Sequence, residues 1–258
     1  MRGWPLTSAA GVSGVTVRFL GSGDAFGSGG RFQACIHVRS QSTNLLLDCG
    51  ASSLIAMRRF GVDPNEIDTI LVSHLHGDHF GGIPFFALDA QLISKRTKSL
   101  IVAGPPGVRE RLMQAMEVLF PGSSQVPQKF ALEFVEMRDR QRVLIGEAAL
   151  TPYEVVHASG APAFALRVEC DGKVITYSGD TEWTDALLEA ARGADLFICE
   201  AYFFEKKVRY HLDYKTLVEH REALACKRLI LTHMSADMPA RVEGLAVECA
   251  DDGNEIVL

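Results

Sequence analysis

The amino-acid sequence predicts a layered α/β fold in which helices cover the faces of β-sheets. Short apolar segments rich in β-branched residues recur along the chain, and amphipathic segments of helical period lie between several of them. Strands with interposed helices occur in the first half, and the second half repeats this mixture. With 47% hydrophobic and 22% charged residues, the 258-residue chain has the composition of a folded protein and not of a disordered one.

The predicted strands are short apolar runs bounded by turn-forming residues. In chain order they cover residues 15–20, 34–38, 44–48, 69–73, 99–103, 130–135, 148–156, 163–169, 173–178, 196–200 and 228–232. The predicted helices are segments in which apolar residues recur with helical period. They cover residues 53–60, 84–94, 107–119, 184–192, 214–225 and 239–248.

A single domain spanning residues 1–258 is the simpler interpretation, because no repeat, low-complexity tract or long linker divides the chain. A chain of this length can bury a full core without metal or disulfides, so a metal site has to be argued from function. The six cysteines are scattered and form no C-x-x-C pair, and we interpret them as reduced thiols. Residues 1–14 hold no continuous apolar segment, and no later run has the ~20 uncharged residues of a membrane span. We therefore expect a cytoplasmic protein without a membrane partner.

Four of the predicted strands are followed directly by histidine or aspartate. Ligands in α/β proteins gather beyond the carboxyl ends of strands, so we expect these side chains to converge on one site. The residues are His74, His76, Asp78 and His79 after the strand at 69–73, then His157, Asp180 and His233 after the strands at 148–156, 173–178 and 228–232.

This set of five imidazoles and two carboxylates, with no thiolate, is typical of a catalytic rather than a structural metal site. Seven ligands are too many for one tetrahedral ion but suit two ions that share a bridging carboxylate and a water. Two metals about 3.5–4 Å apart lower the pKa of such a water and stabilise the oxygens of a displacement, so the pattern predicts hydrolysis. We interpret His37 and His220, which stand outside this pattern, as ordinary core or surface residues.

These motifs resemble those of the metallo-β-lactamase-fold hydrolases, and the resemblance covers nearly the whole chain. The matching segments are Leu20-Gly21-Ser22-Gly23-Asp24, Leu45-Leu46-Leu47 with Asp48-Cys49-Gly50, Ser73-His74-Leu75-His76-Gly77-Asp78-His79, Ser178-Gly179-Asp180-Thr181 and Leu231-Thr232-His233. The resemblance implies an αββα four-layer sandwich, with two mixed β-sheets flanked by helices.

The resemblance also implies a ligand assignment. His74, His76 and His157 would bind the first metal, Asp78, His79 and His233 the second, and Asp180 would bridge the two. Aspartate rather than cysteine at the bridging position points away from true β-lactamases. His76 stands where flavo-diiron relatives typically have glutamate, which favours hydrolytic zinc, and the same ligands accept manganese.

Within this superfamily the chain most resembles the ribonuclease Z and cyclic phosphodiesterase branch. Cys199-Glu200-Ala201-Tyr202 and His211-Leu212-Asp213-Tyr214 look like the His-Glu-Ala-Thr and His-Ser-Thr loops of that branch. The resemblance implies that His211 is a general acid oriented by Glu200, and that these two residues and Asp78 carry the catalysis. An imidazolium held by a carboxylate can stabilise developing charge and protonate an alkoxide leaving group. The alternative is that Glu200 is an ordinary strand-end acid and His211 a loop residue.

The expected substrate follows from the net charge of the chain and from the short connection between His157 and Asp180. The chain has 26 Lys and Arg against 32 Asp and Glu, a net charge of −6, which is unfavourable for gripping RNA. Ribonuclease Z enzymes typically carry a basic arm between the third-histidine loop and the bridging aspartate. Here residues 158–179 hold only two predicted strands joined at Asp171-Gly172, which leaves no room for such an arm.

We therefore expect a dinuclear zinc phosphodiesterase acting on a small or cyclic phosphodiester or a nucleotide. A tRNA 3′-processing endonuclease is the first alternative, with RNA contacts supplied by a partner or a dimer mate. A lactone or ester hydrolase is the second, and it would not need the His211–Glu200 pair. A metal-binding module without turnover is the last. The resemblance to this branch leaves a homodimer open.

Three further segments have two interpretations each. The glycine-rich loop from Gly21 to Arg31 is either a phosphate-binding loop or a flexible connection. The cations at Lys206-Lys207-x-Arg209 form either a rim for an anionic substrate or a solvated run. Four apolar residues of the segment 104–122 belong either to the core or to a lid, and we favour the core. They are Met113, Met116, Leu119 and Phe120.

Overall fold

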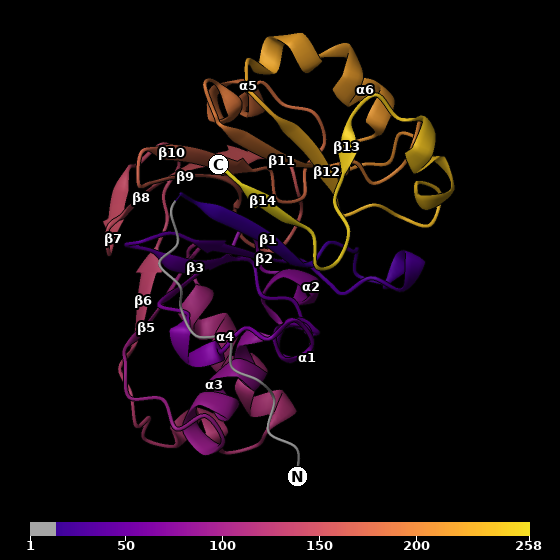
Figure 1. Cartoon of the computed structure of the whole chain (residues 1–258). Coiled ribbons are helices and arrows are strands. Elements are labelled where there is room, and N and C mark those ends of the chain that lie inside the picture. Colours follow the sequence, from indigo (N-terminus) through magenta and orange to yellow (C-terminus); the bar gives the residue numbers. More distant parts are fainter. Residues whose placement is uncertain (1–13) are drawn as a thin grey trace.

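Two seven-stranded sheets lie face to face in residues 14–258, which are the residues that the computed structural model describes (Figure 1). The first sheet has the order β14 (Glu255–Val257), β1 (Thr16–Gly21), β2 (Cys35–Arg39), β3 (Asn44–Leu47), β4 (Thr69–Leu71), β5 (Leu100–Gly104) and β6 (Leu132–Glu136). The second has the order β13 (Glu248–Cys249), β12 (Leu229–Thr232), β11 (Leu196–Glu200), β10 (Lys173–Tyr177), β9 (Ala163–Cys170), β8 (Ala148–Val155) and β7 (Val143–Ile145).

Both sheets are mixed. The strands from β3 to β6 pair in parallel, and β14, β1, β2 and β3 pair antiparallel. In the second sheet β10 to β13 are parallel, and β7 to β10 are antiparallel. This is the expected pair of mixed sheets.

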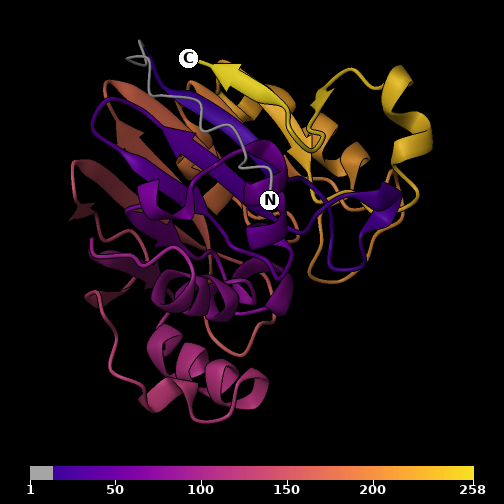
Figure 2. The same cartoon turned by 60° about the horizontal axis from the view of Figure 1, so that its bottom comes forward.

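Helices cover the outer face of each sheet. Those of the first half are α1 (Ser53–Phe60), α2 (Gly77–Phe80), α3 (Ile83–Leu92) and α4 (Val108–Leu119). Those of the second half are α5 (Ala186–Ala191) and α6 (Tyr214–Glu219). Figure 1 shows α1–α4 below the sheets and α5 and α6 above them, and Figure 2 shows the first group again on one side. The layers are therefore helix, sheet, sheet and helix, as the resemblance implied.

Three apolar cores fill the spaces between these four layers. Because side chains alternate along a strand, Leu45 and Leu47 face the second sheet while Leu46 faces the helices of the first half. In β11, Ile198 belongs to the core between the sheets and Phe197 to the core under α5 and α6. Strands buried on both faces are apolar almost throughout, which is why they were recognisable in the sequence.

The predicted elements match the observed ones to within one or two residues at most ends, with several corrections. Residues 239–248 do not form the expected helix: a 3-10 segment, Pro239–Gly244, occupies this place, and β13 begins at Glu248. The helix expected at 214–225 is divided into α6 and the 3-10 turn Arg221–Leu224. The sequence analysis did not find β7, β13, β14 or α2, all of which have two to four residues, too few for a periodic pattern.

Other expectations concern the whole chain. The six cysteines are free, as expected. No helix in residues 14–258 is both long and apolar enough to cross a membrane. The expectation that residues 1–14 hold no continuous apolar segment falls almost entirely on residues 1–13, which lie outside the described residues. The single-domain boundary at 1–258 stays a prediction.

Left-handed backbone within two residues of the ends of three strands turns side chains of the site into the same space. Asp48 after β3, Gly179 after β10 and His233 after β12 have φ values of 59°, 58° and 54°. A Cβ on Gly179 would lie 3.0 Å from Cβ of Ser73 and 3.1 Å from the carbonyl oxygen of Phe164. Glycine at position 179 therefore lets the chain pass close to the first sheet before Asp180.

The Gly179→Ala variant should lose stability and metal affinity together. A left-handed alanine costs about 1–2 kcal/mol, and the contact with Ser73 adds to this cost and shifts Asp180. Gly146→Ala is the matched control, since Gly146 has φ 59° and nothing within 4 Å of an added Cβ. Denaturant unfolding and metal titration of both variants give the measurement. Equal losses of stability with unchanged metal affinity in both would contradict this role.

Candidate metal centre

The seven strand-end residues singled out in the sequence lie together at one end of the two sheets. Their ligand atoms form two groups in which all atoms lie within 4.8 Å of one another. The groups are His74, His76 and His157, and Asp78, His79, Asp180 and His233. The first group holds the three residues that the resemblance assigned to the first metal. The second group holds the three assigned to the second metal, together with Asp180.

Asp180 lies between the two groups. Its Oδ2 atom is 3.8 Å from Nε2 of His74 and 3.3 Å from Nε2 of His233. Its Oδ1 atom is 3.4 Å from Nε2 of His79. One carboxylate therefore faces imidazoles of both groups, which is the arrangement of a bridging ligand.

Several buried polar atoms of this centre have no hydrogen-bond partner: Nε2 of His74, Nε2 of His79 and Oδ1 of Asp180. Buried polar groups without partners are costly, so three of them converging on one space point to a ligand there. Burial lowers the pKa of His74 well below its usual value and keeps its lone pair available. Burial opposes the charge of Asp180, but His233 and His79 hold the pKa of its carboxyl well below the usual range. The donor set fits divalent metal ions.

Hydrogen bonds behind the centre orient the imidazoles. Asp48 accepts from the backbone N–H of Ser73 at 2.7 Å, from the Ser73 hydroxyl at 2.8 Å and from Nδ1 of His79 at 2.6 Å. His157 donates from Nδ1 to the carbonyl oxygen of Tyr210 at 2.8 Å. The bonds from His79 and His157 place the proton of each neutral imidazole on Nδ1, which leaves the lone pair on Nε2 for a metal ion.

The sequence analysis gave no role to Asp48, although it lies in one of the motifs that carry the resemblance. Asp48 comes directly after the apolar strand β3, and Asp180 comes three residues after the end of the apolar strand β10. This strand-end placement is the feature by which Asp48 could have been found.

Glu200 and His211 lie next to the metal ligands. Glu200, fully buried at the end of β11, receives a hydrogen bond from the backbone N–H of Thr181 and one from Nδ1 of His211 at 3.0 Å. Nδ1 of His211 also lies 4.0 Å from Oδ2 of Asp180, and its side chain is 22% exposed. The structure thus brings together the pair that the resemblance implied, and the roles of the two residues stay predictions.

The electrostatics of this pair favour its protonated form. Burial opposes charge on His211, but the hydrogen bond and charge of Glu200, together with the charge of Asp180, raise the pKa of His211 to about 9. Burial and the charge of Asp180 raise the pKa of Glu200 to about 8. The pair therefore retains at neutral pH the proton that a general acid would donate.

The remaining histidines are structural, as expected. His37 is buried and pairs through Nε2 with the amide oxygen of Asn44 at 2.6 Å. His220 donates from Nδ1 to the carbonyl oxygen of Thr216 at 3.1 Å, and its ring lies 4.0 Å from that of Trp183. Neither belongs to the metal centre.

Of the other candidates, Arg31 in the glycine-rich loop pairs through Nε with Asp251 at 3.1 Å, while its buried Nη1 atom has no hydrogen-bond partner. The exposed cations Lys206, Lys207 and Arg209 have no ion pair within residues 14–258. In the segment 104–122, Met116 is buried in the core whereas Leu119 is 46% exposed.

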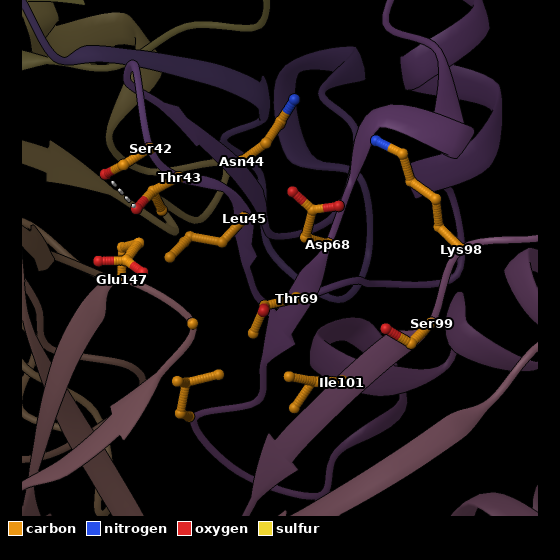
Figure 3. Close-up of a pocket in the computed structure, with 12 residues that line it drawn as sticks. Ser42, Thr43, Asn44, Leu45, Asp68, Thr69, Lys98, Ser99, Ile101 and Glu147 are labelled. Carbon is orange, nitrogen blue, oxygen red and sulfur yellow. Dashed lines mark hydrogen bonds between the residues drawn. The ribbon is translucent and has the colours of Figure 1, made fainter.

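A pocket of about 500 Å³ lies away from the metal centre (Figure 3). It is lined by Asn44, Thr69 and Ile101, near the starts of β3, β4 and β5, whereas the metal ligands follow strand ends. Its charged residues are Asp68, Lys98 and Glu147, all of which are exposed to solvent. Among residues 14–258, the groups that could hold a metal ion all lie at the other end of the sheets.

Replacing Asp48 with Asn should weaken metal binding while leaving every proposed ligand in place. Nδ1 of His79 then loses its charged acceptor, and the loss of such an outer-shell carboxylate typically costs about 10–100-fold in metal affinity. Titration against a competing chelator measures the change. Asp195→Asn is the control, because Asp195 accepts from the backbone of Val174 and pairs with Lys227 at 2.7 Å outside the centre. Unchanged metal affinity in Asp48→Asn would show that this hydrogen bond has no orienting role.

Comparisons with known proteins agree with this geometry. Residues 15–246 match the family model described as Anti-Pycsar protein Apyc1. The ribonuclease Z of Lachnoclostridium phytofermentans is 26% identical over 276 aligned positions, which cover 87% of this chain and 88% of that protein.

Two solved structures share the fold. The metallo-beta-lactamase fold protein YhfI from Bacillus subtilis superposes with a TM-score of 0.74 and 18% identity, covering 95% of this chain and all of YhfI. A diphosphatase from the PhnP family superposes with a TM-score of 0.75 and 20% identity, covering 95% of this chain and 98% of that one. The chain thus has the metallo-β-lactamase fold and is a metal-dependent hydrolase, and it belongs to the Anti-Pycsar protein Apyc1 family.

Proposed function

We propose that this protein is a dinuclear zinc phosphodiesterase that acts on a small or cyclic phosphodiester or on a nucleotide. The observation that carries the proposal is the hydrogen bond between His211 and Glu200, 3.0 Å long, beside the carboxylate of Asp180. A protonated imidazole next to a metal centre is the equipment needed when the leaving group is an alkoxide. A carboxylic ester or a lactone also releases an alkoxide, so the choice of a phosphodiester as substrate rests on the similarity to ribonuclease Z.

In this proposal His74, His76 and His157 would hold one ion and Asp78, His79 and His233 the other. Asp180, which lies between the two groups, would serve both. When bound, two such ions lower the pKa of a coordinated water and offset charge that develops on the phosphate oxygens. Zinc suits the imidazole-rich set best, and manganese is the alternative.

The other steps belong to side chains of the chain itself. Glu200 accepts from Nδ1 of His211, which leaves Nε2 of that imidazole available to the substrate. His211 then offsets charge on the phosphate and donates its proton to the leaving oxygen, so that an alcohol departs instead of an alkoxide. The exposed cations Lys206, Lys207 and Arg209 lie on the segment that leads to His211 and attract an anionic substrate.

A small substrate is supported by the connection between His157 and Asp180. It consists of β9 and β10, joined by a two-residue turn at Asp171-Gly172, and it carries no projecting arm. The turn has φ values of 44° and 74°, as in a tight hairpin. Without such an arm, the lysine and arginine contacts to phosphates that bind a long RNA independently of its sequence have to come from another surface or another chain.

Cleavage of precursor tRNA is the second candidate function, and the similarity to ribonuclease Z over most of the chain favours it. In that case a second copy of the chain or another partner supplies the RNA contacts. The homodimer and the cytoplasmic location stay predictions.

A panel assay tests the proposal. Protein loaded with zinc or manganese is assayed on bis-p-nitrophenyl phosphate, 2′,3′- and 3′,5′-cyclic nucleotides, a precursor tRNA, a lactone and a thioester. We expect metal analysis to give near two equivalents per chain, and turnover of the small phosphodiesters to exceed that of tRNA. A single tightly held equivalent would contradict the dinuclear site, and faster cleavage of tRNA would favour the second candidate.

Replacing His211 with Ala should reduce kcat on a cyclic nucleotide by about 10²–10⁴-fold, the usual contribution of a general acid, without changing the metal content. The rate of the unaltered enzyme should fall above about pH 9, where His211 loses its proton. The variant should lack this alkaline decline. His220→Ala, outside the centre, is the control. Loss of a metal equivalent in His211→Ala would instead make His211 a ligand.

A further inference from the structure

The ring of Tyr202 stacks on the imidazole of His211. The two ring centroids are 4.5 Å apart and the planes differ by 25°. Tyr202 follows Glu200, the hydrogen-bond partner of His211, by two positions in the chain. It stands where the related loop of the ribonuclease Z branch has threonine, which has no ring and cannot make this contact.

The backbone of Tyr202 connects two loops of the site. Its N–H donates to the carbonyl oxygen of Leu212 at 2.8 Å, and its carbonyl oxygen accepts from the N–H of Ser235 at 2.9 Å. Leu212 follows His211, and Ser235 lies two residues after His233. The ring of Phe203 contacts that of Tyr202 edge-on, with centroids 4.8 Å apart. The phenol is therefore held relative to both histidines.

The hydrogen bond from His211 to Glu200 cannot by itself define the direction of the imidazole. The ring is also bonded to Cβ, but a hydrogen bond tolerates a range of angles, so small changes of the side-chain dihedrals still rotate the ring about Nδ1. This rotation moves Nε2 away from the substrate. A face-to-face contact with Tyr202 opposes this rotation. On another side the ring of His157 meets that of His211 at 73°, with centroids 5.1 Å apart.

We propose that Tyr202 is a positioning residue for His211, and this inference rests on the proposed phosphodiesterase function. The aromatic ring performs this role, because it provides the stacking face. The phenolic hydroxyl makes no hydrogen bond to any of residues 14–258, so within these residues only the ring joins Tyr202 to His211. Tyr202 thus acts through His211 and matters most in reactions in which the leaving oxygen must be protonated, since His211 there both offsets charge on the phosphate and donates a proton.

The test compares two substrates in the metal-loaded enzyme. p-Nitrophenolate leaves bis-p-nitrophenyl phosphate without a proton, whereas the alkoxide of a 3′,5′-cyclic nucleotide needs one. In Tyr202→Leu we expect kcat on the cyclic nucleotide to fall by about ten- to a hundredfold, as for a misplaced catalytic group, and turnover of bis-p-nitrophenyl phosphate to fall clearly less, because only the charge-stabilising role of His211 applies to it. Tyr202→Phe, which keeps the ring, should retain both activities. Metal content and the thermal midpoint serve as structural readouts.

A double-mutant cycle tests whether the effect passes through His211. If Tyr202 acts only by positioning that imidazole, Tyr202→Leu should cause little further loss in the His211→Ala background. Independent losses would overturn the proposal, and so would equal losses on the two substrates or a large loss in Tyr202→Phe. Should Tyr202→Leu fail to fold, Tyr202→Met gives the same comparison with a flexible apolar side chain. Unaltered enzyme that hydrolyses neither phosphodiester would refute the proposed function itself.

Discussion

The carboxylate of Asp180 is the group on which the rest of the site depends. It is 2% exposed and lies among imidazoles that come from both sheets: His74 and His79 follow β4, and His233 follows β12. A negative charge at this depth is stable only when positive charge or hydrogen-bond donors surround it. The ring nitrogens supply part of this environment, and the unpartnered Oδ1 atom is directed to the space where a cation fits.

The architecture follows from the need to deliver these groups from separate strands. Parallel strands place their carboxyl ends on one edge of a sheet, and packing the two sheets face to face brings two such edges together. Asp48 and Ser73 come from the first sheet, and Glu200 comes from the second. Each sheet thus supplies candidate ligands and one carboxylate that accepts from an imidazole of the site: Asp48 accepts from His79, and Glu200 accepts from His211. The site lies where the two sheets meet because neither sheet carries a complete set.

The elements that the sequence predicted best are those buried on both faces. The strand 196–200 is observed with the same limits as β11, since an apolar run of that length has no alternative on the surface. The helix expected at 239–248 was wrong because the apolar spacing of Val242 and Leu245 suits a helix and a 3-10 segment equally well. The edge strand β14, with alternating Glu255, Ile256 and Val257, is defined by its pairing with β1 and not by its own sequence.

The sequence by itself determined the chemistry of this protein: a buried strand that ends in His-x-His-x-Asp-His has no structural use for so many ionisable groups, and the lone histidines at other strand ends become candidates only beside this cluster. Only the tertiary structure decided how these groups are arranged. The position of Asp180 between the two ligand groups, the support of His79 by Asp48 and the stack of Tyr202 on His211 join residues up to 106 positions apart, as for His74 and Asp180. Distances between such residues depend on how the two sheets pack against each other, and local sequence patterns do not determine that packing.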